Sequence, residues 1–176
     1  DCLLSRGLGD VYKRQAPKEQ IDLIRFFKNE LPDSKGRYHK DILQFNHEQI
    51  EYNHDFIQWI LPTIDKSQFH PEAPTIDGHF KEQLQHDDLA KSNYCKTCQL
   101  YLNYIGFHCN KRRIQCQITG RLYELPFHNQ LRITRMLNSL NQVGNNQCST
   151  NLYHAIISEI KPDSDKINNL SLIHIS

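Results

Sequence analysis

The stretch HNQLRITRMLNSLNQVG, residues 128–144, indicates the fold class of this 176-residue chain. Its apolar residues lie three or four positions apart: Ile133, Met136, Leu137, Leu140 and Val143. This spacing predicts a helix over residues 131–143 with one face buried in a core. Gly144 follows the last apolar position, where a glycine commonly ends a helix.

Helical patterns continue on both sides of this segment. Toward the C-terminus, Leu152, Ile156 and Ile160 predict a last helix that Lys161–Pro162 would stop. Toward the N-terminus, residues 80–107 carry the longest helical pattern. One stripe of that pattern has three- and four-residue spacing throughout, and consists of Cys95, Cys98, Leu102, Ile105 and Cys109.

A second dense segment, NHDFIQWILP, occupies residues 53–62. It closes a helical region expected over residues 41–61 and stopped by Pro62, although Asn53 could instead cap a new helix. An earlier helix is expected to begin at Pro17 and end at Pro32. Its apolar positions are Ile21, Ile24, Phe27 and Leu31.

Residues 110–127 give the least certain pattern. Ile114, Cys116 and Ile118 alternate as in a strand, so either a short hairpin or a long loop is compatible with them. We therefore expect an all-α fold, a single compact domain of about five to seven helices, with a loop or short hairpin near residues 110–127.

Both ends of the chain look foreign to this domain. Residues 1–15, DCLLSRGLGDVYKRQ, and the tail at 169–176, which ends in LSLIHIS, resemble translated adapter sequence. Genuine flexible ends are the alternative interpretation. The domain itself is expected to occupy residues 16–168.

The charge balance argues against several classes of partner. Lys and Arg total 21 against 20 Asp and Glu, so no global field favours nucleic acid, and Lys111–Arg112–Arg113 is the single basic run. No nucleic-acid partner is expected. No apolar run approaches the roughly 20 residues that span a bilayer, so any membrane association would be at most peripheral.

No catalytic motif is present in the sequence. The patterns G-x-S-x-G, H-E-x-x-H, Walker A and G-x-G-x-x-G are all missing. The expectation is a protein that is not an enzyme and has no cofactor. Cys95-x2-Cys98 with His108, Cys109 and Cys116 has the ingredients of a zinc site, but core packing of these cysteines is the favoured reading. The odd number of cysteines left without Cys2 argues against a disulfide framework and for a reducing compartment.

Two polar clusters are the candidates for ligand binding. The first lies beside Trp59, and its His54 and Gln58 would share a helical face. In the second, residues 128, 132 and 135 would share the face opposite the apolar one. Together the clusters could line a cleft for an acidic or amide-rich ligand. The candidate site residues are Asn53, His54, Asp55, Gln58, Trp59, His128, Asn129, Arg132 and Arg135. The alternative is that the asparagines are helix caps and the arginines form a solvated face or salt bridges.

The same segments carry a family resemblance. Residues 53–62 resemble the N-H-x-Y/F-I-Q-W-L-F-P signature of the opioid growth factor receptor conserved domain, and residues 128–140 resemble its signature H-N-x-L-R-I-T-R-I-L-K-S-L. FFKNELP at 26–32 looks like the opening F-Y-x-N-E-x-P of the family, and Gly36 with Asp41–Leu43 matches the next block. Residues 109–127 depart from the family pattern, and its cysteines are not a family feature.

The resemblance implies an all-helical domain without a transmembrane span. It also implies a receptor-type activity toward an opioid peptide, enkephalin, with a peptide or protein as partner. Animal members imply nuclear or perinuclear association, whereas a microbial member would be cytoplasmic. A protein-interaction scaffold is the alternative function, followed by an enzyme that uses His54 and His128.

Overall fold

The computed structural model describes residues 22–110 and 113–160. The expected foreign ends, the helix start at Pro17 and the stop at Lys161–Pro162 lie outside these residues. Within the described ranges the elements are α1 (Leu23–Phe27), α2 (His39–Ile42), α3 (His47–Tyr52), α4 (Ile57–Ile60), α5 (Gly78–His86), α6 (Asp88–Tyr104), β1 (Phe107–Asn110), β2 (Arg113–Cys116), α7 (Arg121–Glu124), α8 (His128–Gln142) and α9 (Asn146–Ile160).

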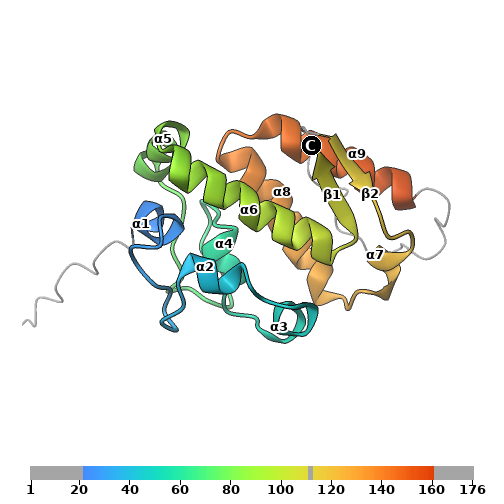
Figure 1. The fold of residues 1–176 in the computed structure, drawn as a ribbon, viewed down its shortest axis with the longest axis horizontal. Helices are drawn as coiled ribbons and strands as arrows, with labels where there is room; N and C mark the ends of the chain where they lie inside the picture. The colour runs from blue at the N-terminus through green and yellow to red at the C-terminus, as the bar shows by residue number, and fades with distance from the viewer. Residues whose placement is uncertain (1–21, 111–112, 161–176) are drawn as a thin grey trace, which may run out of the picture.

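The long helix α6 runs through the middle of the molecule (Figure 1). It contacts α1 and α5 near its beginning and leads into β1 at its end, while α9 packs on α8 and on β2. The buried hydroxyls of Tyr94 on α6 and Ser139 on α8 lie 2.9 Å apart. Helices α6 and α8 therefore form the frame on which the shorter elements pack.

The expected helix over residues 41–61 is wrong, because the structure divides this region into α2, α3 and α4. Asn46 begins α3 with a capping box, in which its side chain accepts from Gln49 N and Gln49 Oε1 accepts from Asn46 N. This reciprocal pair favours a new helix start over continuation. Asn53 is the C-cap of α3 and does not cap a new helix, since Phe56 is the N-cap of α4.

The expected helix over residues 80–107 is also interrupted. Asp87 closes α5 and opens α6, where its carboxylate accepts a 2.9 Å bond from Ala90 N. Cys109, the last residue of the predicted cysteine stripe, lies in β1 and not in the helix, as does Phe107 at the expected helix end. The helix near the N-terminus is likewise shorter than expected: α1 ends at Phe27, and Asn29 adopts a left-handed φ of 62°.

Of the two alternatives for residues 110–127, the structure contains the hairpin, and it begins at Phe107. Strands β1 and β2 are antiparallel, with Phe107 opposite Cys116 and Asn110 opposite Arg113. The fold is thus mostly helical and not strictly all-α. The expected five to seven helices become nine within the described residues, because the two predicted long helices are broken and the short helix α7 was not predicted.

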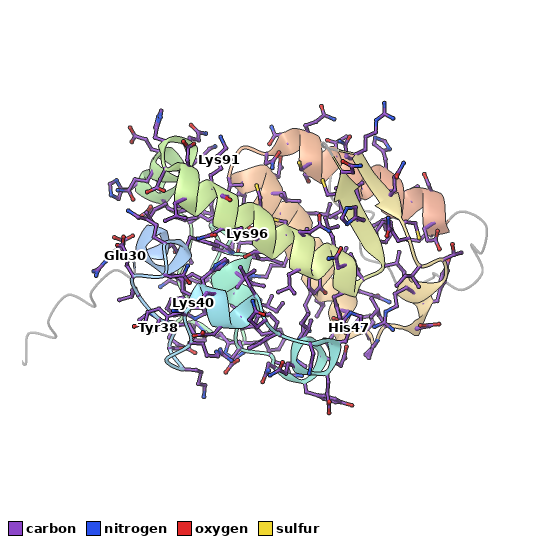
Figure 2. All side chains as sticks on the ribbon, in the orientation of Figure 1. Glu30, Tyr38, Lys40, His47, Lys91 and Lys96 are labelled. Atoms are coloured by element: carbon purple, nitrogen blue, oxygen red, sulfur yellow. The ribbon has the colours of Figure 1, made fainter. Side chains whose placement is uncertain are left out.

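The helix predicted over residues 131–143 is confirmed. Helix α8 covers it, and Gly144 follows with a φ of 89°. The apolar stripe is buried, as are Leu152 and Ile156 of α9. Charged side chains such as Glu30, Lys40 and Lys91 lie on the outside of the molecule (Figure 2). Within the described ranges, no helix has the length and apolar character needed to cross a bilayer.

Candidate functional site

The candidate residues meet where the start of α8 packs against the end of α3. Arg132 makes the central contacts: its Nη1 donates to Ile50 O at 2.7 Å, and its Nη2 donates to Asn53 O at 2.8 Å. The last carbonyls of a helix lack partners within the helix, so the guanidinium satisfies the end of α3. The side chain is 6% exposed. Arg132 is therefore a structural link between residues far apart in the sequence.

Arg135 does the same for α4. Its Nε donates to the carbonyl of Leu61, the C-cap residue of α4, at 2.8 Å. Burial lowers the pKa of Arg135 to about 10, so it stays protonated at neutral pH. The expectation that residues 132 and 135 lie on a face turned away from the core is wrong, because that face of α8 packs against α3 and α4.

Asn129 is fully buried and lies in a hydrogen-bonded network with α3 and α6. Its Nδ2 donates to Glu51 Oε2 at 3.0 Å, while its Oδ1 accepts from the hydroxyl of Tyr101 at 3.2 Å and from Arg132 at 3.3 Å. The Tyr104 hydroxyl also donates to Glu51. The alternative role of Asn129 as a helix cap is wrong, since Phe127 is the N-cap of α8.

Two histidine rings lie at the outer edge of this network. The ring centroids of His54 and His128 are 4.9 Å apart, with an angle of 68° between the planes. Nε2 of His128 lies 2.8 Å from Glu51 Oε1, and Nδ1 of His54 lies 3.2 Å from Arg132 Nη2. His54 is exposed, and the side chain of His128 is 35% exposed.

The charged neighbours of the two rings, Arg132 and Glu51, favour one tautomer for each ring. Asn129 Nδ2 also lies 3.3 Å from His128 Nε2, but it donates to Glu51 and to the Tyr104 hydroxyl. A guanidinium is always a donor, so His54 Nδ1 is an acceptor and its proton lies on Nε2. The carboxylate of Glu51 requires a proton on His128 Nε2, which leaves Nδ1 of that ring as an acceptor when the ring is neutral. Burial and then the charge of Arg132 lower the pKa of His128, which favours the neutral ring.

The other candidate residues lie away from the histidine pair. Asp55 accepts from Arg37 at 2.9 Å, and Asp55 and Trp59 line a separate hollow of about 170 Å³. Gln58 is buried, and Trp59 packs with its ring centroid 5.2 Å from that of Phe26. His54 precedes α4, so the expected helical spacing between His54 and Gln58 does not exist.

Glu51, Tyr101 and Tyr104 belong to the network but were not predicted from the sequence. Glu51 lies on the short helix α3, at a position whose neighbours in sequence give no sign of burial. Its partner Asn129 is 78 positions away, so no local pattern could indicate the contact. Tyr101 and Tyr104 lie three residues apart in α6, as two buried tyrosines of one helix face would. That spacing was the available signal for a buried polar network.

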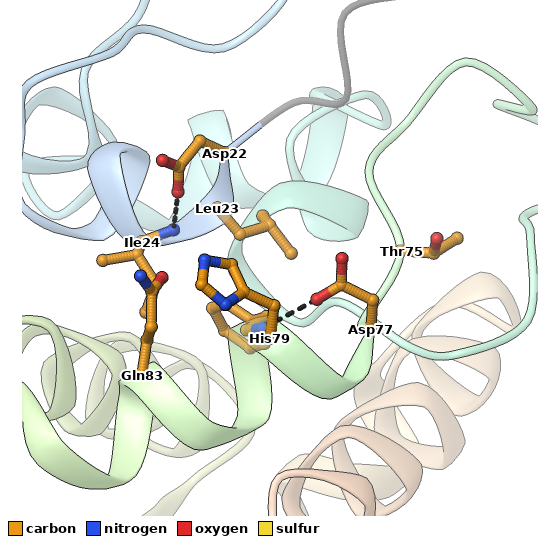
Figure 3. A pocket seen from close by; sticks show the side chains of 8 residues that line it. Asp22, Leu23, Ile24, Thr75, Asp77, His79 and Gln83 are labelled. Carbon is orange, nitrogen blue, oxygen red and sulfur yellow. Dashed lines mark hydrogen bonds between the residues drawn. The ribbon is translucent and has the colours of Figure 1, made fainter.

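A different hollow, of about 380 Å³, lies between the starts of α1 and α5 (Figure 3). Its two carboxylates cap helices, because Asp22 accepts from Ile24 N at 3.0 Å and Asp77 accepts from Phe80 N at 2.7 Å. None of the candidate site residues lines this hollow. Across residues 22–110 and 113–160, no group of three or more His, Cys, Asp or Glu side chains is arranged to hold a metal ion.

The fold and the network define a class of protein: a mostly helical domain in which an arginine, an asparagine and a histidine of one helix bind the end of a distant short helix. The chain belongs to the family of the opioid growth factor receptor (OGFr) conserved region, which matches residues 15–170.

Full-length relatives carry the corresponding names. The chain is 28% identical to the opioid growth factor receptor of Rattus norvegicus over 139 residues, which are 69% of this chain and 23% of the relative. It is 26% identical to opioid growth factor receptor-like protein 1 of Xenopus tropicalis over 151 residues, covering 76% of this chain and 29% of the relative. For the opioid growth factor receptor of Homo sapiens the figures are 28% over 163 residues, 81% and 22%.

The chain thus spans about a quarter of the length of these relatives. No solved structure is significantly similar to it.

Proposed function

We propose that this domain binds a peptide segment at the surface around the histidine pair. We call this the histidine surface, and it consists of His54, His128, Tyr52, Phe127 and Leu131. The observation that carries the proposal is the pair of ring nitrogens left free by the network: a donor, His54 Nε2, and an acceptor, His128 Nδ1, on adjacent rings. A peptide group offers the complementary acceptor and donor.

The surroundings of the two rings suit a peptide. Tyr52 is 73% exposed, and on α8 Phe127 and Leu131 are 61% and 48% exposed. Phe127 and Leu131 lie four residues apart, so they fall on the same side of the helix start. Exposed aromatic and aliphatic side chains beside a few fixed polar groups are typical of peptide-binding surfaces.

The buried network makes the surface rigid, which favours binding. Arg132 and Glu51 each bind one of the two rings and are themselves held by helix ends and tyrosine hydroxyls. Ligand binding then loses little side-chain entropy, because the rings are already oriented. In this proposal the two arginines position the site and do not contact the ligand.

The name of the relatives suggests the first peptide to test. An enkephalin labelled with a fluorophore would be titrated with the intact chain while its anisotropy is measured. We expect saturable binding, weakened at least about tenfold by His54→Ala and by His128→Ala. His86→Ala is the matched control, because His86 is an exposed histidine at the end of α5. Failure to bind at millimolar peptide, or equal weakening by His86→Ala, would contradict the proposal.

A role as a protein-interaction scaffold is the second candidate, favoured by the same exposed apolar side chains. A folded partner would depend on Phe127 and Leu131 more than on the ring nitrogens. Capture of one stoichiometric partner that survives His54→Ala but is lost in Leu131→Asp would favour the scaffold over the peptide site.

We propose further that the histidine pair does not serve as the general base for a serine, threonine or cysteine nucleophile. The ring centroids are 4.9 Å apart, so both rings could reach one substrate. However, among the described residues no Ser, Thr or Cys side chain forms a hydrogen bond with either ring. Turnover of a chromogenic ester or phosphate monoester by the pure protein, lost in His128→Ala, would overturn this.

A further inference from the structure

The second strand of the hairpin, β2, has an edge whose main-chain groups point away from β1. In an antiparallel pair, every second pair of opposed residues exchanges main-chain hydrogen bonds, and the residues between them point outward. Gln117 N donates to Gly106 O at 2.8 Å, so Gly106 and Gln117 form one bonded pair. In the register of the hairpin, His108 and Gln115 form the next bonded pair. The N–H and C=O of Ile114, one position further, therefore point away from β1.

A contact on the opposite edge of the hairpin supports this alternation. Cys109 lies opposite Ile114, and its N–H donates to the side-chain oxygen of Gln99 on α6 at 3.3 Å. That N–H is directed at α6 and not at β2, as the alternation requires. Within residues 22–110 and 113–160, no group bonds to the outward N–H or C=O of Ile114. An edge with free main-chain groups can pair with another strand.

A hollow of about 330 Å³ lies along this edge, between β2 and α9. Figure 1 shows β2 as the outer strand, with β1 between it and the end of α6. The α9 residues of the hollow lie three or four positions apart, so they share one helix face. We call this hollow the β2 groove, and it is lined by Arg113, Ile114, Gln115, Asn151, His154, Ala155 and Ser158. A free edge above a helix face is the arrangement that strand-adding domains offer to an extended peptide.

The charge of the β2 groove indicates which peptides it favours. Its lining includes Arg113 and no aspartate or glutamate. Arg113 is exposed, and none of the ion pairs among the described residues includes it. Opposite charges that face each other on neighbouring strands stabilise the pairing, whereas like charges oppose it. An acidic strand is therefore favoured here over a basic one.

The two faces of the hairpin add a pattern to this preference. Ile114 packs against the core, so a residue paired with it in an added strand would also point inward, toward α9. Ala155 is small and half-buried, which leaves room there for an apolar side chain. The flanking residues of the added strand would point to the outer face, where Arg113 and Gln115 are exposed.

We propose that an extended segment of a partner protein adds to the β2 groove as a third, antiparallel strand. It places an apolar residue opposite Ile114 and acidic residues on either side. The main-chain bonds to Ile114 supply the affinity, and Arg113 supplies the preference for acidic segments. The strand β2 has four residues, so the bonds are few and the binding is weak. The β2 groove shares no residue with the histidine surface and does not depend on the function proposed there.

The test is hydrogen exchange of the isotope-labelled chain, measured by NMR with a defined probe. The probe is an acetylated and amidated hexapeptide of alternating glutamate and valine. We expect saturating probe to slow the exchange of the Ile114 N–H at least about tenfold, because this N–H gains an acceptor. The N–H of Gln147, in the first turn of α9 where a helix leaves its N–H groups unpaired, is the control and should exchange as before.

Two changes separate the main-chain bonds from the charge. N-methylation of the valine amides in the probe removes their donors but keeps its side chains, and should abolish the protection of Ile114. Arg113→Glu should weaken binding about fivefold or more and should favour the same peptide with lysine in place of glutamate. Lys81→Glu makes the same change in net charge at an exposed position of α5, at the other end of the molecule (Figure 1), and should leave binding unchanged.

Several outcomes would overturn the proposal. These are unslowed exchange of Ile114 at millimolar probe, protection that survives N-methylation, and equal weakening by Lys81→Glu. Protection of Ile114 that appears without peptide and grows with protein concentration would show that a second copy of the chain occupies the groove instead. The NMR spectrum of each variant establishes that it folds, so a loss of binding in Arg113→Glu is assigned to the charge.

Discussion

At the scale of single residues, the side chain of Arg132 connects three segments of the chain. It lies on α8 but satisfies two carbonyls of the α3 end and orients His54. Its guanidinium carbon also lies 5.9 Å from the centre of the Phe56 ring. The buried charge is tolerated because its two terminal nitrogens bind four partners, two of which are carbonyl groups of the main chain.

Arg132→Met keeps most of the volume of the side chain but removes these donors. We expect the free energy of unfolding to fall by about 3 kcal/mol, because two buried carbonyls lose charged partners. Urea unfolding followed by the fluorescence of the single tryptophan, Trp59, measures this. Arg113→Met, at an exposed position of β2, should change the same quantity by less than about 0.5 kcal/mol. Similar losses in both variants would show that the capping contacts are unimportant.

The buried ring of His39 is expected to make the free energy of unfolding depend on pH. Its ring is fully buried against Phe26 and Phe27, with Nε2 2.7 Å from Thr97 Oγ1. Burial, and to a smaller extent the charge of Lys96, lower its pKa from 6.5 to about 4. The unfolded chain therefore binds this proton more readily than the folded one between those two pH values, and stability falls as the pH is lowered through that window.

The loss attributable to His39 should reach about 3 kcal/mol by pH 4. His39→Gln can still bond to Thr97 but has no titrating group, so its stability should fall less than that of the unmodified chain over the same range. The free energy of unfolding at neutral pH and near pH 4.5 gives the comparison. Because His128 also has a lowered pKa, part of the dependence should remain in the variant. Identical slopes for both proteins would contradict the assignment to His39.

At the scale of elements, the turn from α6 into β1 depends on Gly106. This residue has a φ of 89°, and its carbonyl accepts from Gln117 N and Ile118 N at 2.8 and 3.1 Å. A Cβ atom at this position would lie 2.8 Å from Arg121 Cβ and 3.1 Å from Ile118 O. The hairpin and α7 can therefore approach the end of α6 only if residue 106 has no side chain.

Gly106→Ala should lower the free energy of unfolding by about 3 kcal/mol, through left-handed strain and this contact together. Gly36→Ala is the matched control: its φ is 79°, but a Cβ there meets nothing within 4 Å. It should cost about 1 kcal/mol, from strain alone. Urea unfolding of the two variants separates the effects, and equal losses would show that the contact with Arg121 relaxes freely.

At the scale of the whole molecule, the buried apolar residues form one continuous core. It extends from Phe26 and Trp59 beneath α1 and α4 to Leu152 and Ile156 on α9. A core shared by all parts of a chain of this size favours a single cooperative unfolding transition. Trp59 reports on one part of this core, and far-UV circular dichroism reports on the helices as a whole.

The two signals should therefore give the same midpoint in urea. Leu152→Ala should lower both midpoints together, by about 3 kcal/mol in free energy, because it removes a fully buried side chain of α9 that is far from Trp59 in sequence. A variant in which the circular dichroism changes early while Trp59 stays unchanged would show that α9 and the hairpin unfold separately.

The sequence by itself determined the helical character, the burial of the α8 stripe and the glycine after it. It also determined family membership through residues 53–62 and 128–140. These features are local: a helix repeats every 3.6 residues, and its caps lie within a few positions of its ends, so a single window of sequence contains them. The breaks at Asn46 and Asp87 were within reach of the same reasoning, since both residues are preferred N-caps.

The tertiary structure alone decided which polar residues face one another. Glu51 binds His128 and Asn129 across more than 70 positions, and Arg132 binds the end of a helix at a similar distance in sequence. It also gathered five sulfur-containing residues from four elements around one hollow. Such contacts depend on the direction and packing of whole helices, which no periodicity within one segment specifies, because the buried network satisfies its hydrogen bonds between segments.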